Sequence, residues 1–274
     1  MLESFLVALE DKADALIPYA VSVAKALNAH PTVVWPRRDI GGLEDGSIEA
    51  RLEAASGSGP VRKARALEGL RAFAAAAEAV GVAAETLEPE VWQDPPRDVL
   101  PRFARAFDFT MVQQREPGRA PARDDLTAAL LSESGRPVWV VPAIQREPVQ
   151  FKRIVVAWDG GESAARAFSE AKRVFVHAER IDIVTITNPQ THRAVFQGGE
   201  RLAARLRRGN IVSEYRRLPS DDDAANALLS YAADMGAELM VSGGYSRSPL
   251  HESLFGGVTR SLLTSMTLPM FFAH

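Results

Sequence analysis

The strongest constraint on this chain is an alternation of short apolar strands and helical segments that begins twice. Five predicted strands alternate with helices up to about Val141, and a second series begins at Phe151. FLVALED (5–11) aligns with IVVAWDG (154–160), and RPVWVVP (136–142) aligns with LPMFFAH (268–274). Strands joined by helical crossovers form parallel sheets. We therefore predict an α/β protein of two tandem doubly wound domains, residues 1–145 and 151–274, each with a five-stranded parallel sheet flanked by helices.

Composition excludes several classes of protein. The chain has 274 residues, of which 46% are hydrophobic and 24% charged, with a formal net charge of -3. This balance argues against general binding of nucleic acid or of a membrane surface. The absence of cysteine removes disulfides and thiolate chemistry, and no apolar run is long enough to span a membrane. We expect a cytoplasmic protein.

Local signals set the expected boundaries of several segments. Residues 36–60 are poor in apolar side chains and end in SGSGP, which predicts a mobile insertion whose function the sequence does not reveal. A helix is expected from Val61 to Val80, and Gly81 should end it. Another is expected from about Gly199 to Arg208. A third should run from Asp222 to Met235, with Asp221 or Asp222 as its N-cap and Gly236 as its stop.

The stretch from Glu238 to Thr259, ELMVSGGYSRSPLHESLFGGVT, carries the clearest functional signal. A predicted strand runs into two glycines, a polar loop follows, and two more glycines precede a helix. Glycines let the backbone approach a ligand closely, and the free N–H groups of a helix start attract anions. An ordinary strand-to-helix turn is the alternative interpretation of the same pattern.

A second strand end completes a candidate site. The strand that begins the second half ends in Ala157, Trp158 and Asp159. Ligands of open parallel sheets bind outside the carboxyl ends of the strands, where the strand order reverses. If the first and fourth strands are neighbours there, Asp159 faces Gly243 across one crevice. A carboxylate opposite backbone amides suits a nucleotide.

At this point the second half resembles a universal stress protein domain. The family's fourth strand leads into a loop of the form G-x2-G-x9-G-(S/T), and this chain has Gly243, Ser246, Gly256 and Gly257 at the four places. The spacing agrees at all four places and the residue type at the first and third. The resemblance covers the second half and, more weakly, the first. It implies the sheet order 3-2-1-4-5 and a tandem chain that forms an intramolecular pseudo-dimer of its two domains.

The resemblance also implies a set of ligand contacts. In family members that bind ATP, the places of Ala157, Asp159 and Ile186 lie on the ribose and adenine side. The loop residues lie on the phosphates, which assigns Gly243, Ser246, Gly256, Gly257 and Val258 to that role. ATP or another adenine nucleotide is the expected cofactor, and neither a catalytic residue nor a metal site is expected.

Departures from the family pattern keep an alternative open. Ser246 replaces a glycine at a cost of about 1 to 2 kcal/mol if it must be left-handed. Gly257 lacks a hydroxyl whose hydrogen bond to an anion is worth about 1.5 to 3 kcal/mol. Arg247, Ser248 and Thr259 could compensate. The leading hypothesis is a non-catalytic universal stress protein, acting as a stress-response sensor or scaffold.

Two other functions remain open. The chain could be an interaction module that has lost nucleotide binding and acts through an unknown protein partner, or it could hydrolyse ATP slowly. The first half has QQREPGRAPARD (113–124) in place of the loop, so we predict that it binds no nucleotide, although Asp11 is matched with Asp159. Further association of the chain into a homodimer also remains open.

Overall fold

The computed structural model describes residues 4–10, 13–38, 58–87, 91–92, 94–115, 126–189, 191–220, 223–244 and 257–274. The elements of the first half are β1 (Ser4–Ala8), α1 (Leu16–Leu27), β2 (His30–Val34), β3 (Arg37–Arg38), α3 (Ser58–Ala79), β4 (Glu85–Thr86), β5 (Val91–Trp92), α4 (Pro96–Ala104), β6 (Phe109–Gln113), α5 (Leu126–Glu133) and β7 (Val138–Val141). Those of the second half are β8 (Arg153–Ala157), α6 (Glu162–Glu170), α7 (Lys172–Phe175), β9 (Arg180–Thr187), α8 (Arg193–Arg208), β10 (Val212–Pro219), α9 (Ala224–Asp234), β11 (Leu239–Gly243), α10 (Gly257–Ser265) and β12 (Met270–Ala273).

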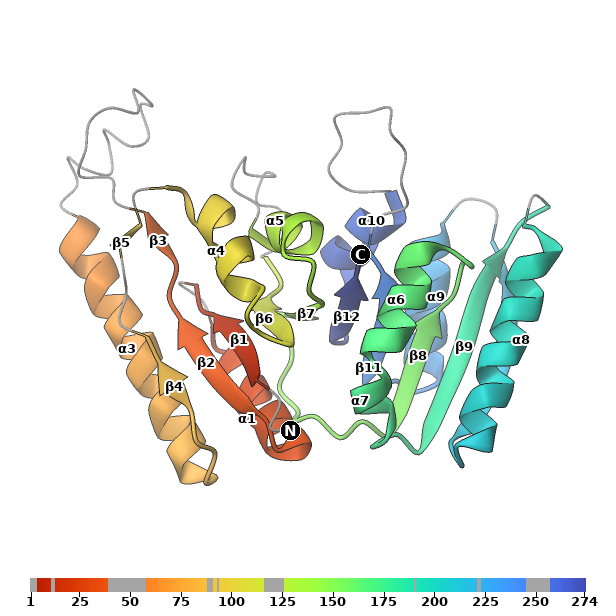
Figure 1. Cartoon of the computed structure of the whole chain (residues 1–274), viewed down its shortest axis with the longest axis horizontal. Helices are drawn as coiled ribbons and strands as arrows, with labels where there is room; N and C mark the ends of the chain where they lie inside the picture. The colour runs from red at the N-terminus through yellow and green to blue at the C-terminus, as the bar shows by residue number, and fades with distance from the viewer. Residues whose placement is uncertain are drawn as a thin grey trace.

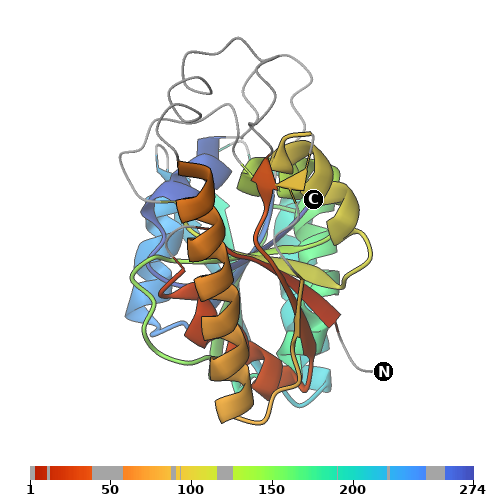
Figure 2. The same cartoon turned by 90° about the vertical axis from the view of Figure 1, so that its left-hand side faces the viewer.

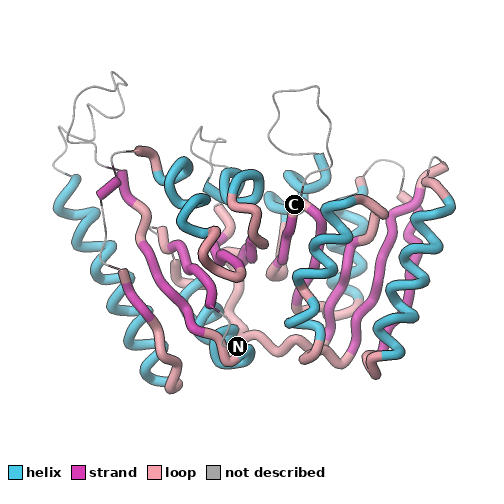
Figure 3. The backbone as a smooth tube through the Cα atoms, in the orientation of Figure 1, coloured by secondary structure: helices cyan, strands magenta, loops and turns pink. Residues whose placement is uncertain are grey.

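Both halves have the predicted strand order, and their two sheets are continuous (Figures 1 and 3). Over the described residues the sheet has ten strands in the order β10-β9-β8-β11-β12-β7-β6-β1-β2-β4. Within each half this is 3-2-1-4-5, with parallel neighbours. The halves meet through β7 and β12, which pair antiparallel with Met270 opposite Val140. The join buries the fifth strand of each half, which would otherwise be an unpaired sheet edge.

Helices lie on both faces of the sheet (Figure 2), which explains why its central strands, such as β7 (VWVV) and β12 (MFFA), are buried and apolar along their whole length. Successive residues of a strand point to opposite faces. Phe5 and Val7 accordingly belong to one buried cluster, and Leu6 and Ala8 to the other.

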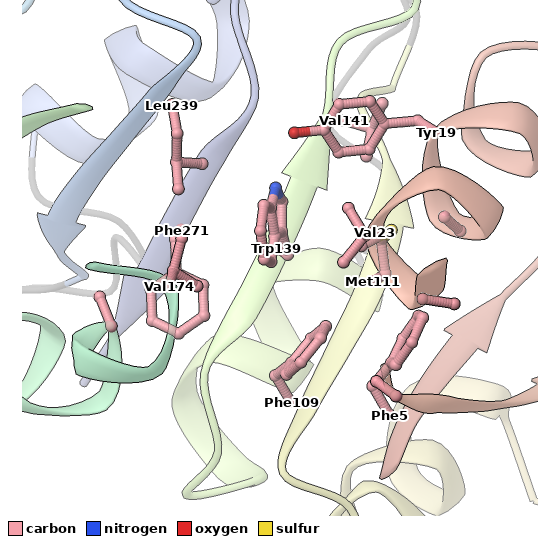
Figure 4. Packing of buried hydrophobic residues seen from close by; sticks show 14 of the residues in the cluster. Phe5, Tyr19, Val23, Phe109, Met111, Trp139, Val141, Val174, Leu239 and Phe271 are labelled. Carbon is pink, nitrogen blue, oxygen red and sulfur yellow. The ribbon is translucent and has the colours of Figure 1, made fainter. Parts of the chain in front are cut away.

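Aromatic side chains fill the junction between the halves (Figure 4). Trp139 of β7 is fully buried, and its ring lies 5.6 Å from that of Phe271 of β12 at an interplanar angle of 86°. The rings of Phe109 and Phe151 lie 5.6 and 5.9 Å from the same indole. Edge-on aromatic pairs of this kind stabilise a packed core beyond their buried area. The junction is therefore part of the hydrophobic core.

Two predicted helix stops are confirmed, and some predicted starts are wrong. Gly81 and Gly236 follow α3 and α9 with φ of +74° and +58°, a conformation that glycine adopts without steric cost. The cap of α9 is Asp223, which accepts a hydrogen bond from the backbone nitrogen of Asn226 at 2.9 Å. It is neither Asp221 nor Asp222.

Helix α8 begins at Arg193, six residues earlier than the predicted start at Gly199. The Nδ1 atom of His192 accepts a hydrogen bond from the backbone nitrogen of Ala194 and caps the helix. Histidine is an uncommon N-cap, so no local pattern predicts a helix start at this position.

The predicted insertion at residues 36–60 is shorter at both ends than expected. Arg37 and Arg38 form β3, which pairs with β5 in a small parallel sheet of its own. Helix α3 begins at Ser58, within the SGSGP segment, instead of at Val61. Residues 39–57 lie outside the described part of the chain.

Candidate functional site

A pocket of about 210 Å³ lies beyond the carboxyl ends of β8 and β11. These strands are neighbours, with Val156 opposite Val241, and the strand order reverses between them. The position agrees with the rule for ligand sites in open parallel sheets. The lining residues are Ala157, Trp158, Asp159, Ser163, Ala164, Val184, Ile186, Ala224, Leu228, Ser242, Gly243, Gly257, Val258 and Thr259.

The end of β8 forms one wall through a tight turn into α6. Trp158 is fixed by two hydrogen bonds, from its backbone nitrogen to the carbonyl of Val184 and from Nε1 to the carbonyl of Val195. Gly160 follows with φ +79°. Asp159 Oδ1 then accepts a hydrogen bond from the backbone nitrogen of Gly161 at 2.8 Å, immediately before the helix. The carboxylate is exposed, and its hydrogen bond stabilises the turn that places the start of α6 beside the pocket.

The end of β11 forms the opposite wall and packs backbone to backbone against α6. A Cβ atom on Gly243 would lie 2.7 Å from the nitrogen of Ala164 and 2.9 Å from the carbonyl carbon of Ser163. Such distances are shorter than van der Waals contact, so only glycine fits here without a shift of the helix. The φ angle of Gly243 is not positive. The structure therefore explains the glycine at position 243 by the close approach of the start of α6, and not by a left-handed backbone conformation.

Three helices direct their first turns at the pocket. Ser163 and Ala164 come from the start of α6, Ala224 is the first residue of α9, and Gly257 is the first residue of α10. The first N–H groups of a helix have no intrahelical partner and carry the positive end of its dipole. The pocket is therefore a favourable place for an anionic group.

The remaining wall is apolar. Val184 and Ile186 from β9, Leu228 from α9 and Ala157 from β8 supply it. An aromatic or aliphatic group of a ligand that binds against this wall is removed from water. One side of the pocket thus suits a flat apolar group and the other an anion.

A buried polar cluster fixes α9 against β9 behind that wall. Asp182 on β9 is 2% exposed and accepts hydrogen bonds from Arg180 and from the hydroxyl of Tyr231, the latter at 2.9 Å. Burial, and then the hydrogen bond to Asp182, raise the pKa of Tyr231 to about 12. The hydrogen bond to Asp182 raises the pKa of Arg180. Because Tyr231 lies one helical turn after Leu228, the cluster also holds the apolar wall in place.

Comparison with known proteins identifies the fold. No family model and no curated protein matches the sequence. Among solved structures, a universal stress protein from Archaeoglobus fulgidus DSM 4304 aligns over 98% of this chain and 95% of its own, with a TM-score of 0.72 and 18% identity. A functionally unknown protein from Pseudomonas aeruginosa PAO1 aligns over 99% and 92%, with a TM-score of 0.59 and 16% identity. The chain has the universal stress protein fold, twice in tandem.

The structure brings most of the predicted site residues of this universal stress protein fold together. Six of them line the one pocket: Ala157, Asp159, Ile186, Gly243, Gly257 and Val258. Ser246 and Gly256, like Arg247 and Ser248, lie outside the described residues. Thr259, named as a source of a hydroxyl, also lines the pocket and is 6% exposed. Which of these residues contact a ligand stays a prediction.

Sequence reasoning missed the contributions of α6 and α9. Ser163, Ala164, Ala224 and Leu228 line the pocket because helices that follow parallel strands begin at the carboxyl end of the sheet. That rule, applied to every helix start instead of only to the glycine-rich loop, would have found three of the four. Leu228 carries no local signal, since its position depends on how α9 packs.

The same region of the first universal stress protein repeat is built differently. Ala8 pairs with Val34 as Ala157 pairs with Val184, so Glu10, and not Asp11, takes the place of Asp159. By the same register Gln113 takes the place of Gly243. Its Oε1 accepts a hydrogen bond from the backbone nitrogen of Leu16 in α1 at 3.1 Å. In the first half the side chain of Gln113 thus caps the start of α1. In the second half Gly243 has no side chain, and the start of α6 lines the pocket.

Within the described residues no group of three or more histidine and acidic side chains could hold a metal ion. No described helix is long and apolar enough to cross a membrane.

Proposed function

We propose that this chain is a universal stress protein whose second half binds ATP or another adenine nucleotide and acts as a non-catalytic sensor or scaffold. The observation that carries the proposal is the composition of the pocket, which is lined both by apolar side chains and by the first residues of three helices. A nucleotide has the matching division into a flat base and an anionic phosphate chain. We propose domain limits at residues 1–145 and 151–274 and, from the sequence, a cytoplasmic location.

The proposed nucleotide lies with its base against β9. Ala157 and Ile186, with Val184 beside them, form the surface for adenine, and Asp159 lies on the ribose side. A carboxylate is a suitable partner for ribose hydroxyls because it accepts their hydrogen bonds.

The phosphates then lie at the starts of α6 and α10. Gly243, Gly257 and Val258 are the described residues in this position. We assign Ser246 and Gly256, which lie outside the described residues, to the same role from the family pattern alone. Thr259, which lies on the first turn of α10 and lines the pocket, supports the proposal as a second source of the hydroxyl missing at Gly257. Helix N–H groups and a nearby hydroxyl bind a phosphate without a lysine.

Equilibrium dialysis of the full chain with labelled ATP tests the proposal, with Gly257→Asp as the decisive variant. A Cβ on Gly257 meets no atom of the described residues within 4 Å, so these residues leave space for a side chain there. An acidic side chain in the first turn of a helix stabilises the helix but repels phosphate. We expect the wild type to retain ATP and Gly257→Asp to lose it, with an unchanged or higher midpoint of urea unfolding.

Gly257→Asn is the matched control, because it has the same size without the charge, and it should retain ATP. If the wild type retains no ATP at millimolar concentration, ATP binding is excluded.

The second candidate is an interaction module that has lost nucleotide binding. Asp159 favours it, because the hydrogen bond that its carboxylate accepts from the backbone nitrogen of Gly161 gives the carboxylate a structural use that needs no ligand. Absence of ATP retention together with an unaltered fold would support this candidate.

A further inference from the structure

Gln114 of the first half caps a helix of the second half. It follows β6 directly and is 8% exposed. Its Nε2 donates hydrogen bonds to the carbonyl oxygens of Leu263 at 3.0 Å and Thr264 at 3.2 Å, 149 and 150 residues away. Its Oε1 accepts a hydrogen bond from the nitrogen of Ala143 at 3.4 Å. The last carbonyls of a helix have no intrahelical donor, so Gln114 satisfies two groups at the end of α10 that would otherwise be unpaired.

The other end of the same helix lines the candidate nucleotide pocket. Gly257, Val258 and Thr259 are its first three residues. A helix of nine residues is about 13 Å long and moves as a unit. A contact that fixes its last turn therefore also fixes the position of its first turn.

Apolar packing alone does not fix α10 to the same degree. Leu262 is fully buried, and Met266 lies just beyond the helix in the same cluster. Hydrophobic contacts are non-directional and permit small shifts along the helix axis. The hydrogen bonds from Gln114 are directional and act at the helix end, so they set where the helix stops.

The second half makes no equivalent side-chain contact with the first half from the matching position. Gln114 takes the place of Gly244, since their backbone nitrogens donate to the equivalent carbonyls of Val141 at 2.7 Å and Ala273 at 2.8 Å. Gly244 has no side chain, and a Cβ there would lie 3.6 Å from Leu131 of α5. At this pair of equivalent positions, only the first half donates a side chain to the other half.

We propose that Gln114 is a positioning residue through which the first half sets the geometry, and hence the affinity, of the nucleotide pocket in the second half. The inference rests on the proposed function. It gives the first half a role in ligand binding without a ligand of its own. A partner that shifts β6 relative to α10 would change nucleotide affinity at a distance.

The test compares Gln114→Met with Gln113→Met in the full chain. Methionine keeps the length of the side chain and removes its hydrogen bonds. Gln113 is the matched control, because it is the adjacent residue, and its bond runs to α1 within the first half. The two readouts are amide hydrogen exchange of residues 257–264 without nucleotide and the dissociation constant for ATP.

For Gln114→Met we expect faster exchange in α10 and a dissociation constant raised about fivefold or more, the usual lower range of coupling between sites. Gln113→Met should leave both unchanged. Equal exchange and equal affinity in the two variants would overturn the inference. If Gln114→Met does not fold, Gln114→Asn retains the amide but is one methylene too short, and the same results are expected. If the wild type does not bind ATP, only the proposed function is refuted. The hydrogen exchange of α10 would then still decide whether Gln114 positions the helix.

Discussion

The nitrogen of Ala164 lies 2.7 Å from the position that a Cβ on Gly243 would occupy. The start of α6 therefore rests directly on the backbone at the end of β11. In the first half the equivalent pair is Leu16 and Gln113, and there a side chain caps the helix start. The residue at this one position, glutamine or glycine, thus decides whether a side chain caps the helix start.

Gly243→Ala should destabilise the protein. Its added methyl group meets helix backbone, which cannot rotate away, and overpacking of this kind costs about 1 to 3 kcal/mol. Gly257→Ala is the control, because its Cβ meets none of the described residues within 4 Å and alanine in a helix is favoured over glycine by up to about 1 kcal/mol. Urea unfolding measures both changes. Equal effects at the two glycines would contradict the close packing of α6 on β11.

Gly257→Ser should strengthen ATP binding. The substitution supplies the hydroxyl that the resemblance to the family leads one to expect, at a position where an added Cβ meets none of the described residues within 4 Å. A hydrogen bond to a charged group is worth about 1.5 to 3 kcal/mol, which corresponds to a tenfold or greater fall in the dissociation constant. Equilibrium dialysis provides the measurement, and Gly257→Ala controls for the added Cβ. No gain over the alanine variant would show that a hydroxyl at position 257 does not contact phosphate.

Tyr231→Phe should reduce the loss of stability in alkali. Burial and the hydrogen bond to Asp182 raise the pKa of Tyr231 to about 12, whereas an unfolded tyrosine titrates near about 10. The unfolded state therefore loses its proton first. The stability that the neutral hydroxyl contributes is complete below about pH 10 and falls as the pH rises toward 12.

The measurement is the free energy of unfolding of both proteins between about pH 9 and pH 12. The wild type should lose more of it across this range than Tyr231→Phe. The difference between the two proteins cancels the contribution of the other tyrosines, including Tyr19, whose pKa burial also raises. Parallel curves would contradict the prediction.

Phe271→Ala should cost about 3 to 5 kcal/mol of unfolding free energy, the usual range for removal of a buried phenyl ring. Phe271 is 1% exposed and packs on Trp139 across the junction of the halves. Phe103→Ala is the control, because that ring is 36% exposed and lies within the first half. Urea unfolding compares them. A small and equal cost for both variants would mean that the junction contributes little to the core.

Local patterns explain which parts of the fold and site could be predicted. Strand runs such as 154–157, the helix stops at Gly81 and Gly236, and the pairing of Asp159 with Gly243 in one pocket depend on periodicity, glycine conformation and a general topological rule. Asp223 as a cap, His192 as a cap and Leu228 as a pocket wall depend on how individual side chains settle. The three neighbouring aspartates are chemically equivalent as caps, histidine is an uncommon cap, and the place of Leu228 depends on the packing of α9, so the sequence does not single these residues out.

The sequence by itself determined the order of strands and helices, their repetition, and the strand ends that carry glycines and an acidic residue. These features follow from interactions between residues close together in the chain. Only the tertiary structure decided that β7 and β12 join the two sheets, that Gly243 makes room for α6, and that Gln114 reaches α10. Those contacts join residues far apart in sequence, and their partners are set by how the two halves pack, which no local pattern records.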